Sequence, residues 1–221
     1  PRSLLPVGVA GSGSLVFASA TPGSFPGATR AHILGSRGDS AVALVREGGF
    51  DPLPVDGTTG GLVTLSIVDS AGRWTTSHAK VGPATPRVVR LSPAARRTDV
   101  PLNVRIVAVF SAPVDSATAV VGVQLLQDGE VVATQSRLSP DRLAVELTPD
   151  APLAANTAYE VTVAATVTDV FGTALGAPVS TSFTTGSASA GPQFLSIAGY
   201  AHPWRNSWLD LYRLQEGDTV G

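Results

Sequence analysis

Short runs in which apolar and polar residues alternate extend along this chain, and Gly, Pro, Ser, Thr and Asp separate one run from the next. Alternation with a period of two places the apolar side chains on one face of an extended strand. Such runs predict half-buried strands joined by turns, and no convincing long helix is expected among them. The pattern therefore predicts an all-β protein built from antiparallel strands.

The expected strands form two groups. In the first group they lie at residues 15–18, 29–34, 41–46 and 62–68. Residues 51–61 are rich in Pro, Gly and Asp and are expected to be a loop. In the second group strands are expected at residues 87–91, 103–110, 122–127, 131–136, 142–147, 158–164 and 179–184, which is the spacing of a seven-strand sandwich. Asp128-Gly129 predicts a tight hairpin, because this pair accepts the positive φ that such a turn requires.

A length of 221 residues suits two domains of about 100 residues each. We expect the first domain at residues 1–84 and the second at residues 85–187. Residues 188–221 are expected to be a linker followed by the start of a further β module, or an aromatic-rich tail.

The composition excludes several classes of protein. With 15 Lys and Arg against 17 Asp and Glu, and with the basic residues scattered, there is no electrostatic footprint for nucleic acid. Cysteine is absent, which excludes disulfides, thiolate zinc sites and cysteine nucleophiles. No run approaches the roughly 18 consecutive apolar residues of a membrane helix, so no membrane insertion is expected.

Five motifs follow one another between residues 85 and 186. They are Pro86 with Ser92-Pro93, the Phe-Ser-x-Pro-Val-Asp stretch at 110–115, the Leu-x-x-x-Thr-x-Tyr-x-Val-x-Val stretch at 153–163, the Thr-Asp-x-x-Gly stretch at 168–172, and Ser-Phe-Thr-Thr at 182–185. This order resembles the bacterial Ig-like family found in surface-layer and adhesin-type proteins. The resemblance implies a β-sandwich and an extracellular setting, and it identifies no ligand.

Residues 6–82 resemble a second bacterial Ig-like or carboxypeptidase-regulatory-like module, through the stretches at 25–29, 47–50 and 65–73. In the last of these, Asp69 and Gly72 repeat the Asp-x-x-Gly spacing of Asp169 and Gly172. The repetition predicts the same turn in both modules. The expected fold is thus a tandem of Ig-like antiparallel β-sandwiches.

The sequence offers few candidates for catalysis, and we expect no enzyme. His32, His78 and His202 lie in three separate regions without ligand spacing around any of them. Ser77 and Lys80 have the Ser-x-x-Lys spacing of acylating hydrolases, but the companion motifs are absent and the spacing is interpreted as chance.

No cofactor is expected. Calcium is the one metal considered, since it binds carboxylate and carbonyl oxygens at loops, and Asp69, Asp115 and Asp169 are its candidate ligands. Each of these residues is isolated in sequence, whereas a dedicated site gathers several oxygens. The favoured interpretation is that each carboxylate caps a turn by accepting hydrogen bonds from nearby backbone amides.

Arg37-Gly38-Asp39 spells the integrin-recognition tripeptide, and we favour its interpretation as an ordinary hairpin loop. Aromatic residues gather near the C-terminus, and Trp204, Trp208 and Tyr212 are the residues predicted to contact a partner. The favoured interpretation of that segment is the opening of a third sandwich. A carbohydrate-binding role, in which Trp204 and Trp208 stack on sugar rings, is the weaker alternative.

These observations lead to one main functional hypothesis. It is a non-catalytic extracellular or cell-surface tandem that serves as a stalk, spacer or adhesive module of a larger bacterial protein. Its partners would be neighbouring domains of the same polypeptide and a protein or a cell-surface glycan. The alternative is a pair of accessory domains of a secreted enzyme or large repeat-containing toxin whose active part lies elsewhere in the polypeptide.

Overall fold

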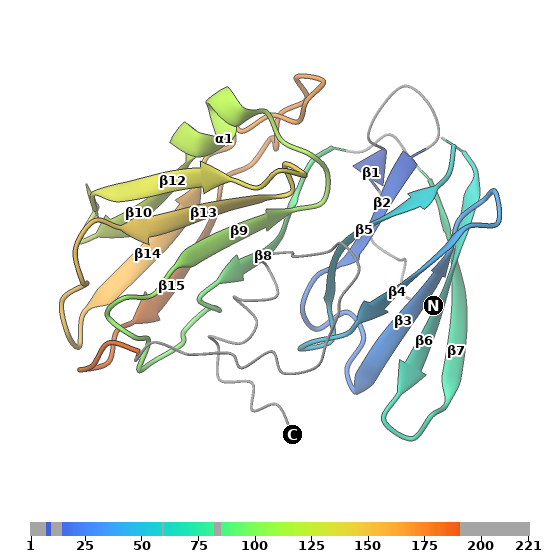
Figure 1. Ribbon diagram of the computed structural model, residues 1–221, viewed down its shortest axis with the longest axis horizontal. Coiled ribbons are helices and arrows are strands. Elements are labelled where there is room, and N and C mark those ends of the chain that lie inside the picture. Colours follow the sequence, from blue (N-terminus) through green and yellow to red (C-terminus); the bar gives the residue numbers. More distant parts are fainter. Residues whose placement is uncertain (1–7, 10–14, 59, 82–84, 191–221) are drawn as a thin grey trace, which may run out of the picture.

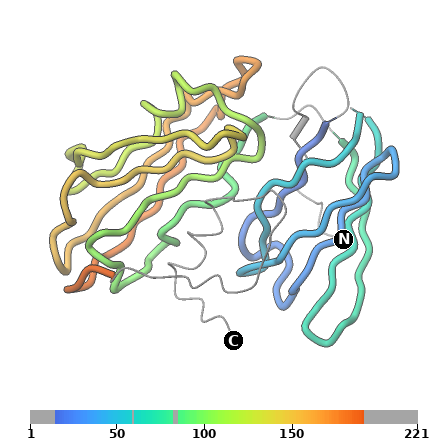
Figure 2. Tube along the Cα trace, in the orientation of Figure 1, coloured from blue at the N-terminus to red at the C-terminus, as the bar shows by residue number. Residues whose placement is uncertain are grey.

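The computed structural model describes residues 8–9, 15–58, 60–81 and 85–190. These residues form almost only antiparallel strands, arranged as two β-sandwiches that lie beside one another (Figure 1). The chain completes the first sandwich before it enters the second (Figure 2). The predicted fold class is confirmed. No helix in this part of the chain has the length and apolar character needed to cross a membrane.

The first sandwich packs a three-stranded sheet, in the order β1-β2-β5, against a four-stranded sheet, in the order β4-β3-β6-β7. Its strands are β1 (Gly8–Val9), β2 (Leu15–Ala20), β3 (Ala28–Leu34), β4 (Ser40–Leu44), β5 (Phe50–Asp56), β6 (Leu62–Asp69) and β7 (Trp74–Lys80). Alternate residues of β2, β3 and β6, among them Val16, Ile33 and Leu65, point between the sheets and form its core. This alternation is the pattern from which the strands were predicted.

The structure corrects two expectations in this sandwich. Residues 51–61 were predicted to be a loop, but β5 occupies their first half despite Pro52 and Pro54. Among the described strands β5 pairs with β2 alone, at the edge of its sheet. An edge strand tolerates proline because one row of its backbone groups needs no partner. No strand was predicted at residues 74–80, where β7 pairs with β6 along its whole length.

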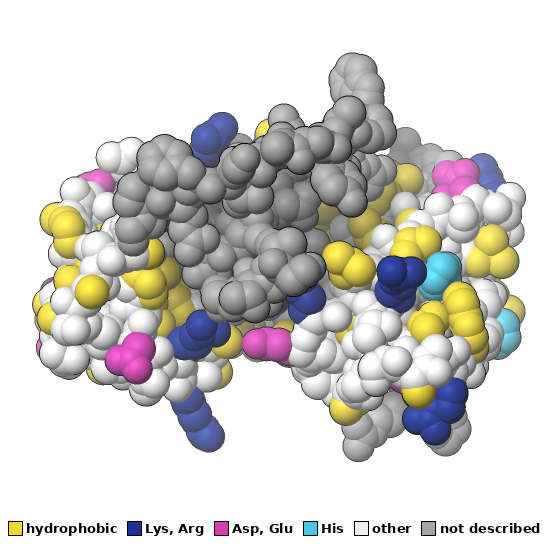
Figure 3. Space-filling view, turned by 60° about the horizontal axis from the view of Figure 1, so that its bottom comes forward, with side chains coloured by type: hydrophobic (Ala, Val, Ile, Leu, Met, Phe, Trp, Pro, Cys, Tyr) yellow, Lys and Arg dark blue, Asp and Glu magenta, His cyan; other side chains and the backbone are white. Residues whose placement is uncertain are grey.

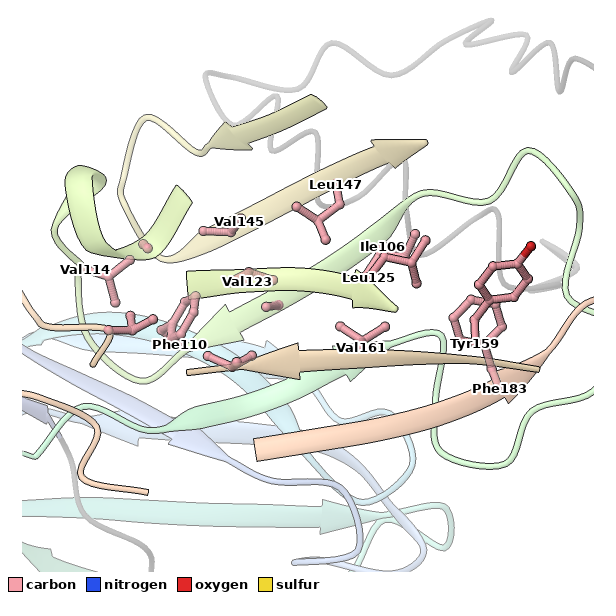
Figure 4. Packing of buried hydrophobic residues seen from close by; sticks show 14 of the residues in the cluster. Ile106, Phe110, Val114, Val123, Leu125, Val145, Leu147, Tyr159, Val161 and Phe183 are labelled. Carbon is pink, nitrogen blue, oxygen red and sulfur yellow. The ribbon is translucent and has the colours of Figure 1, made fainter. Parts of the chain in front are cut away.

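The second sandwich packs the sheet β12-β13-β9-β8 against the sheet β11-β10-β14-β15. Its strands are β8 (Val88–Ser92), β9 (Ile106–Phe110), β10 (Val123–Gln127), β11 (Glu130–Val131), β12 (Thr134–Leu138), β13 (Ala144–Pro149), β14 (Ala158–Val163) and β15 (Val179–Thr184). Figure 4 shows the apolar side chains that fill the space between the sheets, with Phe110 at one end and the Tyr159 and Phe183 rings at the other. Phe110 has no exposed surface.

β9 is buried on both of its faces. Ile106, Ala108 and Phe110 belong to the core between the sheets, whereas Val107 and Val109 form a second cluster with Val89 and Ala144 on the outer side. This explains why its sequence is a continuous apolar run rather than an alternating one. A continuous apolar run is typical of an inner strand, and β9 lies between β13 and β8 in its sheet.

Local signals determine how the strands of this sandwich are connected. Asp128 and Gly129 have φ values of 52° and 87° and join β10 to β11, so the predicted hairpin turn is confirmed. The strand predicted at residues 131–136 is divided into β11 and β12. A short helix, α1 (Ser116–Gly122), precedes β10, and it begins where the Asp115 carboxylate accepts hydrogen bonds from the amides of Ala117 and Thr118.

Tyr159 explains the spacing of the longest motif in the second sandwich. Its hydroxyl accepts a hydrogen bond of 2.9 Å from the Ala154 amide, and its ring lies 5.7 Å from that of Phe183. A tyrosine that bonds the backbone a few residues upstream is the tyrosine corner of Ig-like sandwiches. The side chain thus joins the turn before β14 to the core.

We expect the substitution Tyr159→Phe to lower the free energy of unfolding by about 1 to 2 kcal/mol, because it leaves the Ala154 amide without this acceptor. The substitution Tyr159→Ala, which also removes a buried ring, should lower it by roughly 3 to 5 kcal/mol. Urea denaturation measures both values. Equal stability of Tyr159→Phe and the unsubstituted protein would show that the corner contributes only through its ring.

Candidate functional site

A groove of about 270 Å³ lies between the two sandwiches. The first sandwich lines it from the end of β2, the turn between β4 and β5, and the start of β5, and the second lines it from β8 and the loop that follows. The lining residues are Ala20, Pro22, Leu44, Arg46, Glu47, Gly49, Phe50, Asp51, Val89, Arg90 and Arg97. Both sandwiches therefore contribute residues to the groove, and we call the place where they meet the joint.

An ion pair crosses this joint. Arg90 Nε lies 3.2 Å from Asp51 Oδ1, and Arg90 Nη2 lies 3.3 Å from Asp51 Oδ2. The two side chains are 20% and 13% exposed, so water screens the pair less than it would screen a surface pair. Because the guanidinium contacts both carboxylate oxygens, the contact favours one orientation of β8 relative to β5.

Charged and apolar side chains together line the groove. Three arginines and two carboxylates surround the apolar side chains of Phe50 and Val89. The residues that line it include no serine, threonine, histidine, lysine or tyrosine.

The two Asp-x-x-Gly sequences form the same turn, as predicted. Asp69 Oδ1 accepts hydrogen bonds of 2.9 Å from the Ala71 and Arg73 amides. Asp169 Oδ1 accepts hydrogen bonds of 2.9 and 2.8 Å from the Phe171 and Thr173 amides. Both glycines have positive φ, at 76° and 83°.

The three aspartates considered as calcium ligands all bond backbone amides. Asp69 and Asp169 do so in the turns, and Asp115 does so at the start of α1. Among the described residues, no group of three or more His, Asp or Glu side chains has an arrangement that could hold a metal ion. The hydrogen bonds therefore agree with the turn-capping interpretation of these carboxylates.

Arg73 holds the pKa of Asp69 below its usual value of 3.8. The hydrogen bond from the Arg73 amide is the largest cause, and the hydrogen bond from its guanidinium, at 2.7 Å, follows. Both bonds favour the charged carboxylate.

The other candidate residues lie apart from one another. The His78 ring bonds Thr64 and the His32 ring lies 4.8 Å from the Trp74 ring. Ser77 and Lys80 lie on the strand β7, where residues three apart point to opposite faces, so the helical arrangement needed for Ser-x-x-Lys chemistry is not formed.

The Arg-Gly-Asp sequence lies in the turn between β3 and β4. Asp39 Oδ2 accepts a hydrogen bond of 2.8 Å from the Asp56 amide, and its Oδ1 is buried. The carboxylate is thus turned toward the protein and not toward a partner. The structure favours the loop interpretation of this tripeptide.

Trp204, Trp208, Tyr212 and His202 lie outside the described residues. Sequence reasoning missed Asp51 and Arg90, because Asp51 was expected in a loop and Arg90 belongs to a different module. It also gave no role to Trp74, which is 58% exposed on β7. The signal available in the sequence was a tryptophan that closely follows the Asp69 to Gly72 turn.

Residues 83–185 match the sequence model of a family described as Bacterial Ig-like domain. This range contains all eight strands of the second sandwich. No curated protein matches the chain.

Several solved structures are similar to part of the chain. One is CopC from Methylosinus trichosporium OB3b, with 18% identity over 46% of this chain and 93% of that chain and a TM-score of 0.39. An L,D-transpeptidase from Mycobacterium smegmatis has 24% identity over 47% of this chain and 41% of that chain, with a TM-score of 0.35. The N-terminal part of the bacterial S-layer protein SbsC has 19% identity over 47% of this chain and 24% of that chain, with a TM-score of 0.36.

The family match and the fold together define a class for the second sandwich. It is an Ig-like β-sandwich, with a tyrosine corner and two facing antiparallel sheets, and its residues match the bacterial Ig-like family model. This fold is of a non-catalytic class. The first sandwich has the same two-layer architecture and lies outside the matched range.

The stability contributed by the Asp69 carboxylate should depend on pH. Because its folded pKa is lowered, this contribution is present above the pKa of the unfolded chain and is lost as the pH falls through the folded pKa. The substitution Asp69→Asn should therefore destabilise the protein at neutral pH and have a smaller effect in acid. Urea denaturation of both proteins over this range tests the expectation, and a difference independent of pH would contradict it.

The pair between Asp51 and Arg90 should couple the two sandwiches. In a double-mutant cycle with Asp51→Ala and Arg90→Ala we expect a coupling energy of about 1 kcal/mol, because the pair is partly buried. Small-angle X-ray scattering should show a wider range of inter-module orientations in Arg90→Ala. Arg137→Ala, at an exposed position on β12, is the control and should leave the profile unchanged. An unchanged profile of Arg90→Ala would show that the pair does not hold the joint.

Proposed function

We propose that this chain is a non-catalytic extracellular tandem that acts as a spacer and adhesive module of a larger bacterial surface or secreted protein. The observation that carries the proposal is the match of residues 83–185 to the bacterial Ig-like family. Ig-like sandwiches supply a rigid framework with loops and sheet faces exposed to partners.

The two separate cores support the spacer role. Each sandwich buries its own apolar cluster, so each can fold on its own residues and the two can follow one another along a polypeptide. The ion pair between Asp51 and Arg90 supports a preferred angle at the joint. A stalk needs both properties, since its length comes from folded modules and its reach depends on the stiffness between them.

The adhesive part of the proposal concerns the partner. We propose a protein or a cell-surface glycan, together with neighbouring domains of the same polypeptide. Trp204, Trp208 and Tyr212 remain proposed contact residues in the C-terminal segment, because tryptophan and tyrosine are frequent anchors at interfaces.

The extracellular location can be tested on bacterial cells that produce the parent protein. Antibodies raised against residues 85–187 should label intact cells or be depleted by the culture medium. An antibody against a cytoplasmic protein, which labels only lysed cells, is the control. Labelling of this protein only after lysis would contradict an extracellular role.

A further inference from the structure

One face of the first sandwich carries an unusual set of exposed side chains. On the outer side of the sheet β4-β3-β6-β7, Leu34, Val42, Leu44, Leu62 and Trp74 are all exposed. We call this surface the outer face, and its outward positions are Arg30, His32, Leu34, Ser40, Val42, Leu44, Leu62, Thr64, Ser66, Val68, Trp74, Thr76, His78 and Lys80. Figure 3 shows hydrophobic, basic and histidine side chains close together on the surface of this sandwich.

Strand register brings the aromatic and polar groups of this face together. Val68 pairs with both Arg30 and Trp74 on its two neighbouring strands, so these side chains lie in one row across the sheet. The His32 ring lies 4.8 Å from the Trp74 ring at an angle of 49°. Trp74 is 58% exposed and presents much of its indole to solvent.

The next rows carry hydroxyl groups in fixed positions. Ser66 Oγ and Thr76 Oγ1 lie 3.2 Å apart, and Thr64 Oγ1 lies 3.1 Å from His78 Nδ1. Each hydroxyl keeps hydrogen-bonding capacity beyond this one contact. The face thus combines an aromatic ring with ordered polar groups.

The charge of the outer face has one sign. Arg30 and Lys80 are cations, and none of the outward positions on these four strands holds Asp or Glu. The whole chain has a formal charge of −2, so this face differs from the average surface. A polyanion is complementary to it, whereas a second copy of the same face would be repelled.

We infer that the outer face binds an acidic polysaccharide. The C–H groups of a sugar ring pack on an exposed indole, its carboxylates pair with Arg30 and Lys80, and its hydroxyl groups bond the Ser and Thr rows. A single-stranded nucleic acid needs successive aromatic platforms for its bases, and Trp74 is the one indole among the described residues of this face. The inference deepens the proposed adhesive function and rests on it.

Binding of sodium alginate, a polyuronate, tests the inference. Native affinity electrophoresis in gels with alginate should retard the protein, and dextran, a neutral glucan, should retard it much less. Trp74→Ala should weaken alginate binding roughly tenfold, as expected for an aromatic anchor. Phe171→Ala is the matched control, since Phe171 has the same exposed fraction of 58% in a turn of the second sandwich.

Charge variants test the electrostatic part separately. Arg30→Gln combined with Lys80→Gln should weaken alginate binding and reduce its dependence on salt. Val42→Glu adds a carboxylate to an exposed position of the face and should also weaken binding. Arg137→Gln in the second sandwich should have no effect. Thermal unfolding of every variant separates loss of binding from loss of fold.

Four results would overturn the inference. They are no retardation by alginate, equal retardation by dextran, unchanged binding by folded Trp74→Ala, and stronger binding of poly-glutamate or single-stranded DNA than of alginate. The last would assign the face to an acidic protein or a nucleic acid. None of these results bears on the labelling of intact cells, so failure of this inference is distinguishable from failure of the proposed function.

Discussion

Burial of apolar side chains between facing sheets is the interaction on which the other features of this molecule depend. In each sandwich one set of alternating residues fills the space between the layers, including Phe110 and Ile106 in the second and Val16 and Ile33 in the first. Neighbouring residues of a strand point to opposite faces of its sheet. The residues that pack into the core therefore determine which residues point outward. The outward set carries the groups with functional interest, such as Arg90 at the joint and Trp74 on the outer face.

The joint and the outer face would make different contributions to the proposed spacer and adhesive module. At the joint, a partly buried pair of opposite charges contributes little free energy but favours one orientation, because both carboxylate oxygens of Asp51 contact the Arg90 guanidinium. At the outer face, the sheet holds side chains from four strands in fixed rows. Because the strand pairing already fixes the backbone, binding of a polymer would cost conformational entropy only in the side chains and in the polymer.

Most strands, the hairpin at Asp128-Gly129 and the paired Asp-x-x-Gly turns could be predicted from the sequence, because each depends on residues close together in the chain. β5 was predicted wrongly since prolines usually exclude a strand, and only its place at a sheet edge makes them acceptable. β7 was missed because Ala79 is its one buried residue, so its sequence lacks the apolar alternation of a half-buried strand. Its pairing with β6, which local sequence does not encode, makes it a strand.

The sequence by itself determined the class of fold and the local turns, because hydrophobic alternation and the backbone preferences of Asp and Gly act over a few residues. The tertiary structure decided which outward groups meet. Asp51 and Arg90 are 39 residues apart and belong to different sandwiches, and His32 and Trp74 come together through the pairing of β3, β6 and β7. Such contacts depend on strand register and on the packing of whole layers, and these follow from the summed burial of many side chains rather than from any local pattern.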